Sequence, residues 1–110
     1  TGSRTAAAGS GTQSITGAGF TPKAAVVIAA LTSDAGAMSM GVVDDASAES
    51  LIRQLTGGVV EFSSPCIYIG DATATNLMDA GATLTSDGLD LSWTKTGAGM
   101  LVNFGILFLG

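Results

Sequence analysis

The sequence predicts an all-β fold, an antiparallel β-sandwich of jelly-roll-like type with about eight strands. Short runs rich in apolar and β-branched residues alternate with Gly, Ser, Asp and Pro along the chain, a spacing typical of sandwiches and jelly rolls. The run at 24–31 is apolar and uncharged throughout, which is typical of a covered strand. The Asp-Gly pair at 87–88 stands between two alternating runs and is a strong β-hairpin signal.

Length and composition limit the classes of protein to which this chain can belong. A chain of 110 residues suits one domain with one core. Hydrophobic residues make up 46% of it but aromatic residues only 5%, so we expect a core of small side chains. Charged residues make up 12%, about half the usual share of roughly 25%. This low charge indicates that other protein covers part of the surface, the alternative being a neutral surface rich in Ser, Thr and Gly.

Charge and residue usage exclude several function classes. The net charge is −5 and the four basic residues are scattered, so nucleic-acid binding has no electrostatic footprint. The lack of histidine removes Ser-His-Asp and Cys-His nucleophiles and the usual zinc sites. Cys66 is the single cysteine, which rules out an intrachain disulfide, and its apolar surroundings predict a buried, inert thiol. We find no signal-peptide pattern and no apolar run of 18 residues, so no membrane span is predicted.

The N-terminal half begins with an arm. Residues 1–11 are mostly Gly, Ser, Thr and Ala, and we expect a flexible arm that gains order only against a neighbouring subunit. Residues 12–110 should form the sandwich domain. The strand at 24–31 follows Pro22, which has no N–H to donate and therefore marks a strand entry. Both faces of this strand are apolar, so it should be central, with Val26 and Ile28 in the core.

The other segments are assigned from periodicity and turn residues. Residues 48–55 have apolar side chains at helical spacing, but their short length and their surroundings favour an irregular strand. Residues 76–82 hold few bulky side chains and are predicted to be irregular. After the hairpin turn, Leu89, Leu91 and Trp93 should point into the core, opposite a wet face. Further strands are predicted at 12–16, 37–43, 59–63, 66–69, 82–85, 89–95 and 100–109.

The terminal strand is apolar on both faces. A two-layer sandwich buries only one face of each sheet, so a second cover is needed, and another subunit is the expected cover. We therefore predict a homo-oligomer, most simply a trimer. The predicted interface is one face of this strand, formed by Met100, Val102, Phe104, Ile106 and Phe108. The other face carries Leu101, Asn103, Gly105, Leu107 and Leu109.

No residue is predicted to act in catalysis, to bind a cofactor or to hold a metal. The acidic pair at 44–45 and the carboxylates of Asp87 and Asp90 lack the spacing of a calcium loop and suit turns and a solvated face. Trp93 could stack on a sugar, but its alternation with leucines favours the core. A carboxylate pair for glycoside hydrolysis stays open, although no obvious cleft accompanies it.

Three segments resemble small β-sandwich modules of tailed-bacteriophage virion proteins. They are Gly19-Phe20-Thr21-Pro22-Lys23-Ala24, Ser39-Met40-Gly41-Val42 and Asp87-Gly88-Leu89-Asp90-Leu91-Ser92-Trp93. The resemblance covers roughly residues 12–110 and implies a non-enzymatic structural role in the virion, on the capsid surface or the tail. It implies a decoration or cement protein that binds the major capsid protein and stabilises the head. The alternative is a receptor-binding, carbohydrate-binding module of a tail or head fibre, and the scarcity of aromatics on wet faces weakens that reading.

Overall fold

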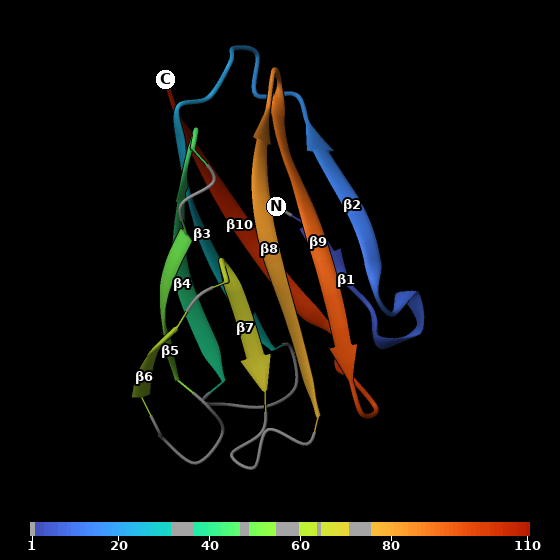
Figure 1. Ribbon diagram of the computed structural model, residues 1–110. Coiled ribbons are helices and arrows are strands. Elements are labelled where there is room, and N and C mark those ends of the chain that lie inside the picture. Colours follow the sequence, from blue (N-terminus) through green and yellow to red (C-terminus); the bar gives the residue numbers. More distant parts are fainter. Residues whose placement is uncertain (1, 32–36, 47–48, 55–59, 64, 71–75) are drawn as a thin grey trace.

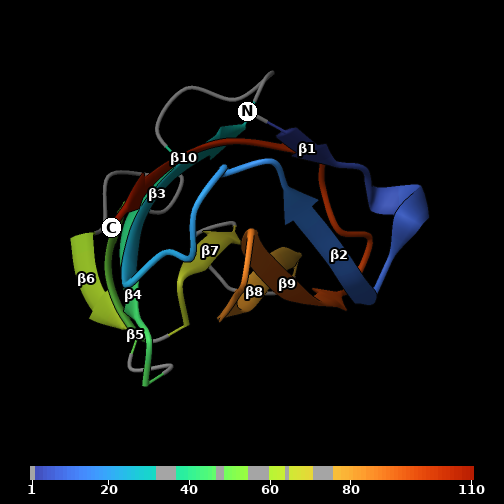
Figure 2. The same ribbon diagram turned by 90° about the horizontal axis from the view of Figure 1, so that it is seen from above.

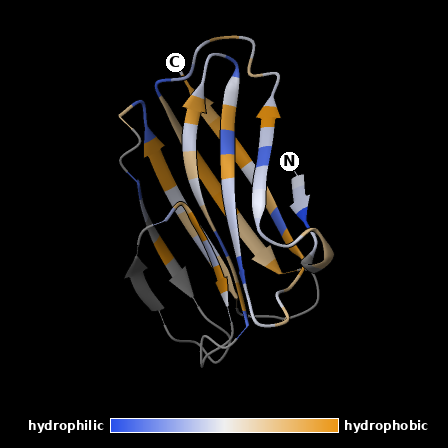
Figure 3. Cartoon of the chain, turned by 45° about the vertical axis from the view of Figure 1, so that its right-hand side comes forward, coloured by the Kyte–Doolittle hydropathy of each residue, from blue (hydrophilic) through white to orange (hydrophobic). Residues whose placement is uncertain are grey.

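The computed structural model describes residues 2–31, 37–46, 49–54, 60–63, 65–70 and 76–110. These residues form two antiparallel sheets packed face to face, which confirms the predicted all-β sandwich (Figure 1). Residues of high hydropathy lie along the strands of both sheets, because both contribute to the core between them (Figure 3).

The larger sheet has six strands in the order β1-β10-β3-β4-β5-β6. Its strands are β1 Gly2–Arg4, β3 Ala24–Leu31, β4 Met38–Asp44, β5 Glu49–Gln54, β6 Val60–Ser63 and β10 Val102–Leu109. Seen from above, this sheet curves around the smaller one, so that its inner face is concave and its outer face convex (Figure 2).

The smaller sheet has four strands in the order β2-β9-β8-β7. They are β2 Gly11–Thr16, β7 Ile67–Gly70, β8 Leu77–Thr85 and β9 Gly88–Thr96, and a short 3-10 helix, Ala6–Ala8, lies between β1 and β2. Strands β3 to β6 and strands β7 to β9 each pair with the next strand along the chain. These strands form two meanders, whereas β2 pairs with β9 and β10 pairs with β3 and β1, all partners far away in the sequence.

The core consists largely of small and medium side chains, as the composition predicts. Leu89, Leu91 and Trp93 are buried in it, which confirms these predicted core positions. The indole Nε1 of Trp93 donates a hydrogen bond to the side-chain oxygen of Gln13 at 2.9 Å, and its ring lies 6.0 Å from that of Phe104. The polar group of the tryptophan therefore has a partner although the ring is enclosed.

The prediction that Val26 and Ile28 lie in the core is wrong. On β3 the inward residues are Ala25, Val27 and Ala29, whereas Val26 is partly exposed and Ile28 is 50% exposed. Adjacent side chains of a strand point to opposite faces, so the shift by one residue reverses the assignment.

The N-terminal segment also differs from the prediction. Gly2–Arg4 pairs with Val102–Phe104 of β10 in the same chain, and Gly11 already begins β2. Arg4 Nε and Nη2 donate hydrogen bonds to the carbonyl oxygen of Gly9 at 3.2 and 3.0 Å, which holds the connection between the two strands. The described part of residues 1–11 therefore forms its strand pairs within its own domain and does not need a neighbouring subunit to do so.

The predicted secondary structure of two other segments can be compared with the observed strands. Glu49–Gln54 is a strand, which confirms the choice of strand over helix. The prediction that 76–82 is irregular is wrong, since Leu77–Thr85 is a nine-residue strand paired with both β7 and β9. The β8–β9 hairpin turns at Ser86 and Asp87, as the Asp-Gly signal predicts.

Candidate docking surface

The outer face of the six-stranded sheet is apolar over its middle four strands. Apolar residues from these strands lie on it in register across neighbouring strands, and one row runs Gly105, Ile28, Met40 and Ile52. Ile28, Met40, Val42 and Leu107 are 50%, 44%, 46% and 60% exposed. The apolar members of this outer face are Ala24, Val26, Ile28, Ala30, Met38, Met40, Val42, Ile52, Leu107 and Leu109.

The outer face of the four-stranded sheet is different. Its exposed positions on β2, β8 and β9 are hydroxyl residues, among them Thr12, Thr83, Ser92 and Thr94. Burying a polar group without a partner costs free energy, so this face is suited to water. The contrast places the unusual surface on one side of the sandwich, because single exposed apolar residues are ordinary but a contiguous group is not.

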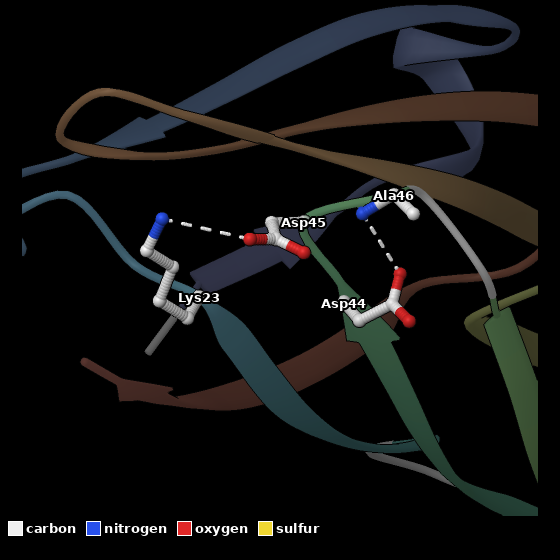
Figure 4. A network of polar contacts seen from close by, with 4 residues as sticks. All are labelled: Lys23, Asp44, Asp45 and Ala46. Atoms are coloured by element: carbon white, nitrogen blue, oxygen red, sulfur yellow. Dashed lines mark hydrogen bonds and ion pairs between the residues drawn. The ribbon is translucent and has the colours of Figure 1, made fainter.

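Charged groups lie at one margin of the apolar face. Asp44, at the end of β4, accepts a hydrogen bond from the N–H of Ala46 at 2.9 Å (Figure 4). Lys23, just before β3, forms an ion pair with Asp45, with 3.6 Å between Nζ and Oδ2. Both partners are well exposed, so the pair contributes little to stability. An apolar centre with a polar rim is the usual anatomy of a protein interface.

The apolar face is uneven. Met38, Met40, Val42 and Ile52 project from β4 and β5, and we call this group the bulky flank. On the other side of β3 an open hollow of about 560 Å³ lies over β10 and β1. Its outward-facing lining residues are Ser3, Ile28, Ala30, Asn103 and Gly105. Gly105 contributes to this hollow because it has no side chain to fill it, and a Cβ there would meet nothing within 4 Å.

The predicted interface on the terminal strand falls on the wrong face. Val102 and Phe104 are buried in the core, and Met100, Ile106 and Phe108 pack against it. They face the concave inner side, where the four-stranded sheet covers them. The exposed apolar residues of this strand are the odd-numbered Leu107 and Leu109.

The sequence contained one signal that identifies the outer face. Between Met38 and Val43 the bulky residues Met38, Met40 and Val42 alternate with Ser39 and Gly41. The small residues face inward because β7 crosses close to them, so the bulky residues face outward. Ile52 lies opposite Met40 and was not singled out from the sequence.

Carboxylates that could act as a catalytic pair are not brought together at the end of β4. A second hollow, of about 330 Å³, is lined by Asp44, Glu49 and Ser50 among others. Glu49 lies opposite Val43 in the β4–β5 ladder, so it projects to the inner face while Asp44 projects to the outer one. The Glu49 carboxylate accepts a hydrogen bond from the N–H of Ala82, beyond the end of the β7–β8 ladder. Glu49 thus has a structural role.

Among the residues that the structure describes, burial perturbs three ionisable groups. It raises the pKa of Glu49, with the hydrogen bond from Ala82 acting in the opposite direction. It also raises the pKa of Asp79. Burial, and to a lesser extent the charge of Glu49, raises the pKa of Cys66 to about 12. A thiol with such a pKa is protonated at neutral pH and unreactive, which agrees with the sequence prediction for Cys66.

Comparison with family models, with curated proteins and with solved structures found no match. The resemblance to phage virion modules is therefore supported by the sequence segments alone and stays a prediction. In the part of the chain that the structure describes, no three His, Cys, Asp or Glu side chains are grouped to hold a metal ion. The same residues include no helix with the length and hydropathy to cross a membrane.

Proposed function

We propose that this chain is a non-enzymatic structural protein of a tailed-bacteriophage virion, a capsid decoration protein that binds the major capsid protein lattice and stabilises the head. The observation that carries the proposal is the apolar outer face of the six-stranded sheet. Contiguous exposed apolar surfaces of this kind commonly mark sites at which another protein binds.

Two further observations support a structural role. The outer face is formed by the middle of a rigid sheet, whereas ligand and catalytic groups are commonly carried on loops. In addition, two of the three segments that resemble virion modules, 19–24 and 39–42, belong to or border strands of this sheet. The outer face supplies contacts with neighbouring protein subunits in this proposal, and the hydroxyl-rich face of the other sheet stays in water.

The test is binding to phage heads that lack the protein. Purified wild-type chain should sediment with the heads and raise the temperature at which they release DNA. The variant Met40→Asp places a charge on the outer face and should bind far more weakly, because an unpaired buried charge is costly. Ser92→Asp adds the same charge to the outer face of the other sheet and serves as the matched control.

Two results would overturn the proposal. One is wild-type chain that does not bind heads at any concentration tested. The other is binding to glycans on an array without binding to heads, which would favour the receptor-binding alternative.

A further inference from the structure

We propose that the free edge of β10, from Ile106 to Leu109, binds an extended segment of another protein as an added β-strand. The inference concerns an edge of the six-stranded sheet, not its outer face, and it does not rest on the proposed function. In strand addition the unpaired backbone groups of an edge supply affinity and alternate side chains supply specificity.

β10 is paired along its whole length on one side only. β3 pairs with all eight of its residues, whereas β1 pairs only with Val102 to Phe104 (Figure 1). The Leu109 carbonyl accepts a hydrogen bond from the N–H of Lys23, which precedes β3. The backbone groups of successive residues point to opposite sides of a strand. The odd-numbered residues of β10 therefore bond to β3, and the even-numbered ones point toward the β1 side.

The backbone groups of Ile106 and Phe108 are thus left at an open edge. Among the residues that the structure describes, none forms a hydrogen bond with their two N–H groups or their two carbonyl groups on that side. An added strand that runs antiparallel to β10 would bond to all four groups and would lie in line with β1.

The side chains show what β1 does for the part of β10 that it covers. Opposite β1, the inward Val102 and Phe104 are 0% and 4% exposed. Gly2 lies directly over the Phe104 ring, since a Cβ on Gly2 would approach that ring to 2.6 Å. Beyond the end of β1, Ile106 and Phe108 also pack against the core but are only half-buried. A strand added in line with β1 would cover them as β1 covers Phe104.

This edge has none of the features that protect free edges from other chains. Natural edges are commonly blocked by charged residues, by proline or by a β-bulge. Residues 105–109 are Gly-Ile-Leu-Phe-Leu, and their register with β3 is continuous. An apolar edge without such protection is suited to pair with a further strand.

The donor segment must bring unpaired backbone groups and apolar side chains at alternate positions. Each described strand of this chain is already paired in its own sheet. The connections 5–10 and 17–23 are held by hydrogen bonds within the domain. We therefore assign the donor to a different protein, in a segment of at least four residues, about 14 Å long.

Amide hydrogen exchange of the wild-type protein tests the open edge. The N–H groups of Ile106 and Phe108 should exchange at least about ten-fold faster than those of Gly105 and Leu107, which point toward β3. Equal rates would show that the edge is closed within the protein and would overturn the proposal. Protection that grows with protein concentration would name a second copy as the occupant and overturn the assignment to a different protein.

Four residues, Thr-Val-Thr-Val, fused directly before Thr1 supply a tethered donor. In the register of β1, the two valines lie opposite Ile106 and Phe108 and should slow exchange there at least about ten-fold. Thr-Pro-Thr-Pro places proline rings where the bonding N–H groups would be and should give no protection. Pro-Val-Pro-Val places them where N–H groups point away and should protect. The same result from all three extensions would overturn the proposal.

A separate peptide tests binding from another chain. N-acetylated Ser-Thr-Val-Thr-Val-amide should shift the amide resonances of Ile106 and Phe108 saturably in the wild type, but not in the Thr-Val-Thr-Val variant, whose edge is occupied. N-methylation of both valines should abolish the shifts, whereas N-methylation of both threonines should not. No shift with the unmethylated peptide, or equal shifts with both methylated forms, would overturn the proposal.

These outcomes separate the strand site from the proposed function. Failure of the peptide to bind would remove the strand site and leave the decoration role, because Met40→Asp tests the outer face. Peptide binding by a chain that does not bind heads would keep the strand site and remove the decoration role.

Discussion

Gly41 on β4 packs against the carbonyl group of Cys66, so closely that a Cβ at position 41 would lie 2.0 Å from that oxygen. Next to it, the buried hydroxyl of Ser39 accepts a hydrogen bond from the N–H of Tyr68 at 3.3 Å. β4 therefore turns its small residues toward the other sheet. The pleat of the strand then places Met38, Met40 and Val42 on the outer face.

Gly41→Ala should destabilise the protein severely. The added methyl group would overlap backbone atoms, which cannot move aside as the end of a side chain can, and we expect a loss of about 3 kcal/mol or more in the free energy of unfolding. Urea unfolding followed by circular dichroism measures it. Gly105→Ala is the control, because its methyl group enters open space on the same sheet. Equal stability of the two variants would contradict the close packing of β4 on the segment before β7.

Trp93→Ala should cost about 3–5 kcal/mol, as removal of a large core aromatic does. The Trp93 side chain is 3% exposed in the wild type. The variant lacks both its contact with Phe104 and its hydrogen bond to Gln13. Thermal unfolding gives the size of the effect. Tryptophan emission of the native wild-type protein is an independent check, and a spectrum typical of full water exposure would refute the burial of this residue.

The β8–β9 turn holds the connection between β2 and β3. The Asp87 carboxylate accepts hydrogen bonds from the N–H groups of Gly17 at 3.0 Å and Gly19 at 2.8 Å. Both glycines have positive φ, 94° and 82°, a conformation that glycine adopts without steric cost. This contact joins the turn glycines and the hairpin, which the sequence predicts separately.

Asp87→Ala should therefore destabilise the protein by about 1–2 kcal/mol and speed amide hydrogen exchange at Gly17 and Gly19. Asp87→Asn keeps one acceptor oxygen, so its stability should lie between that of Asp87→Ala and that of the wild type. Exchange rates at both glycines that do not change in Asp87→Ala would show that the carboxylate does not hold this connection.

The stability of the protein should rise as the pH falls from neutral through the raised pKa values of Glu49 and Asp79 toward their ordinary values. Burial raises the pKa of both Glu49 and Asp79 in the folded state. A carboxyl group with a raised pKa favours folding most when it is protonated, and that contribution is lost as the pH rises through its folded pKa. Glu49→Gln should raise the melting temperature at pH 7 and reduce its dependence on pH. A variant whose melting temperature follows pH as the wild type does would contradict this role of Glu49.

The sequence predicted the parts of the fold that depend on local pattern. The strand at 24–31 follows from periodicity and its bounds are correct, and the turn residues at 86–88 place the hairpin turn to within one residue, since Gly88 already begins β9. A strand is predicted at 82–85, but residues 77–81 lack such a pattern, because Gly and Ala occupy positions where a strand usually has bulk. They form a strand since partners on both sides, β7 and β9, supply the hydrogen bonds. Gly2–Arg4 likewise forms a strand because β10, about 100 positions away in the sequence, supplies its hydrogen bonds.

The existence of an exposed apolar surface on the terminal strand was predicted, but its position was not. The need for a second cover on an apolar terminal strand is visible in the sequence, but the residues of that strand do not themselves show which of its faces is outside. In β3 and β10 both faces are apolar, so composition does not decide between Val27 and Ile28, or between Phe104 and Leu107. The strand register decides it, through the inward Ser39 and Gly41 of the neighbouring strand.

A cryo-electron-microscopy map of intact particles would show whether the outer face docks on protein in the virion. The chain should be found on the head, with Ile28, Met40 and Leu107 in van der Waals contact with a neighbouring subunit and the hydroxyl-rich face of the other sheet toward solvent. A map in which these three side chains face solvent, or in which the chain is absent from the particle, would contradict the docking role of the outer face.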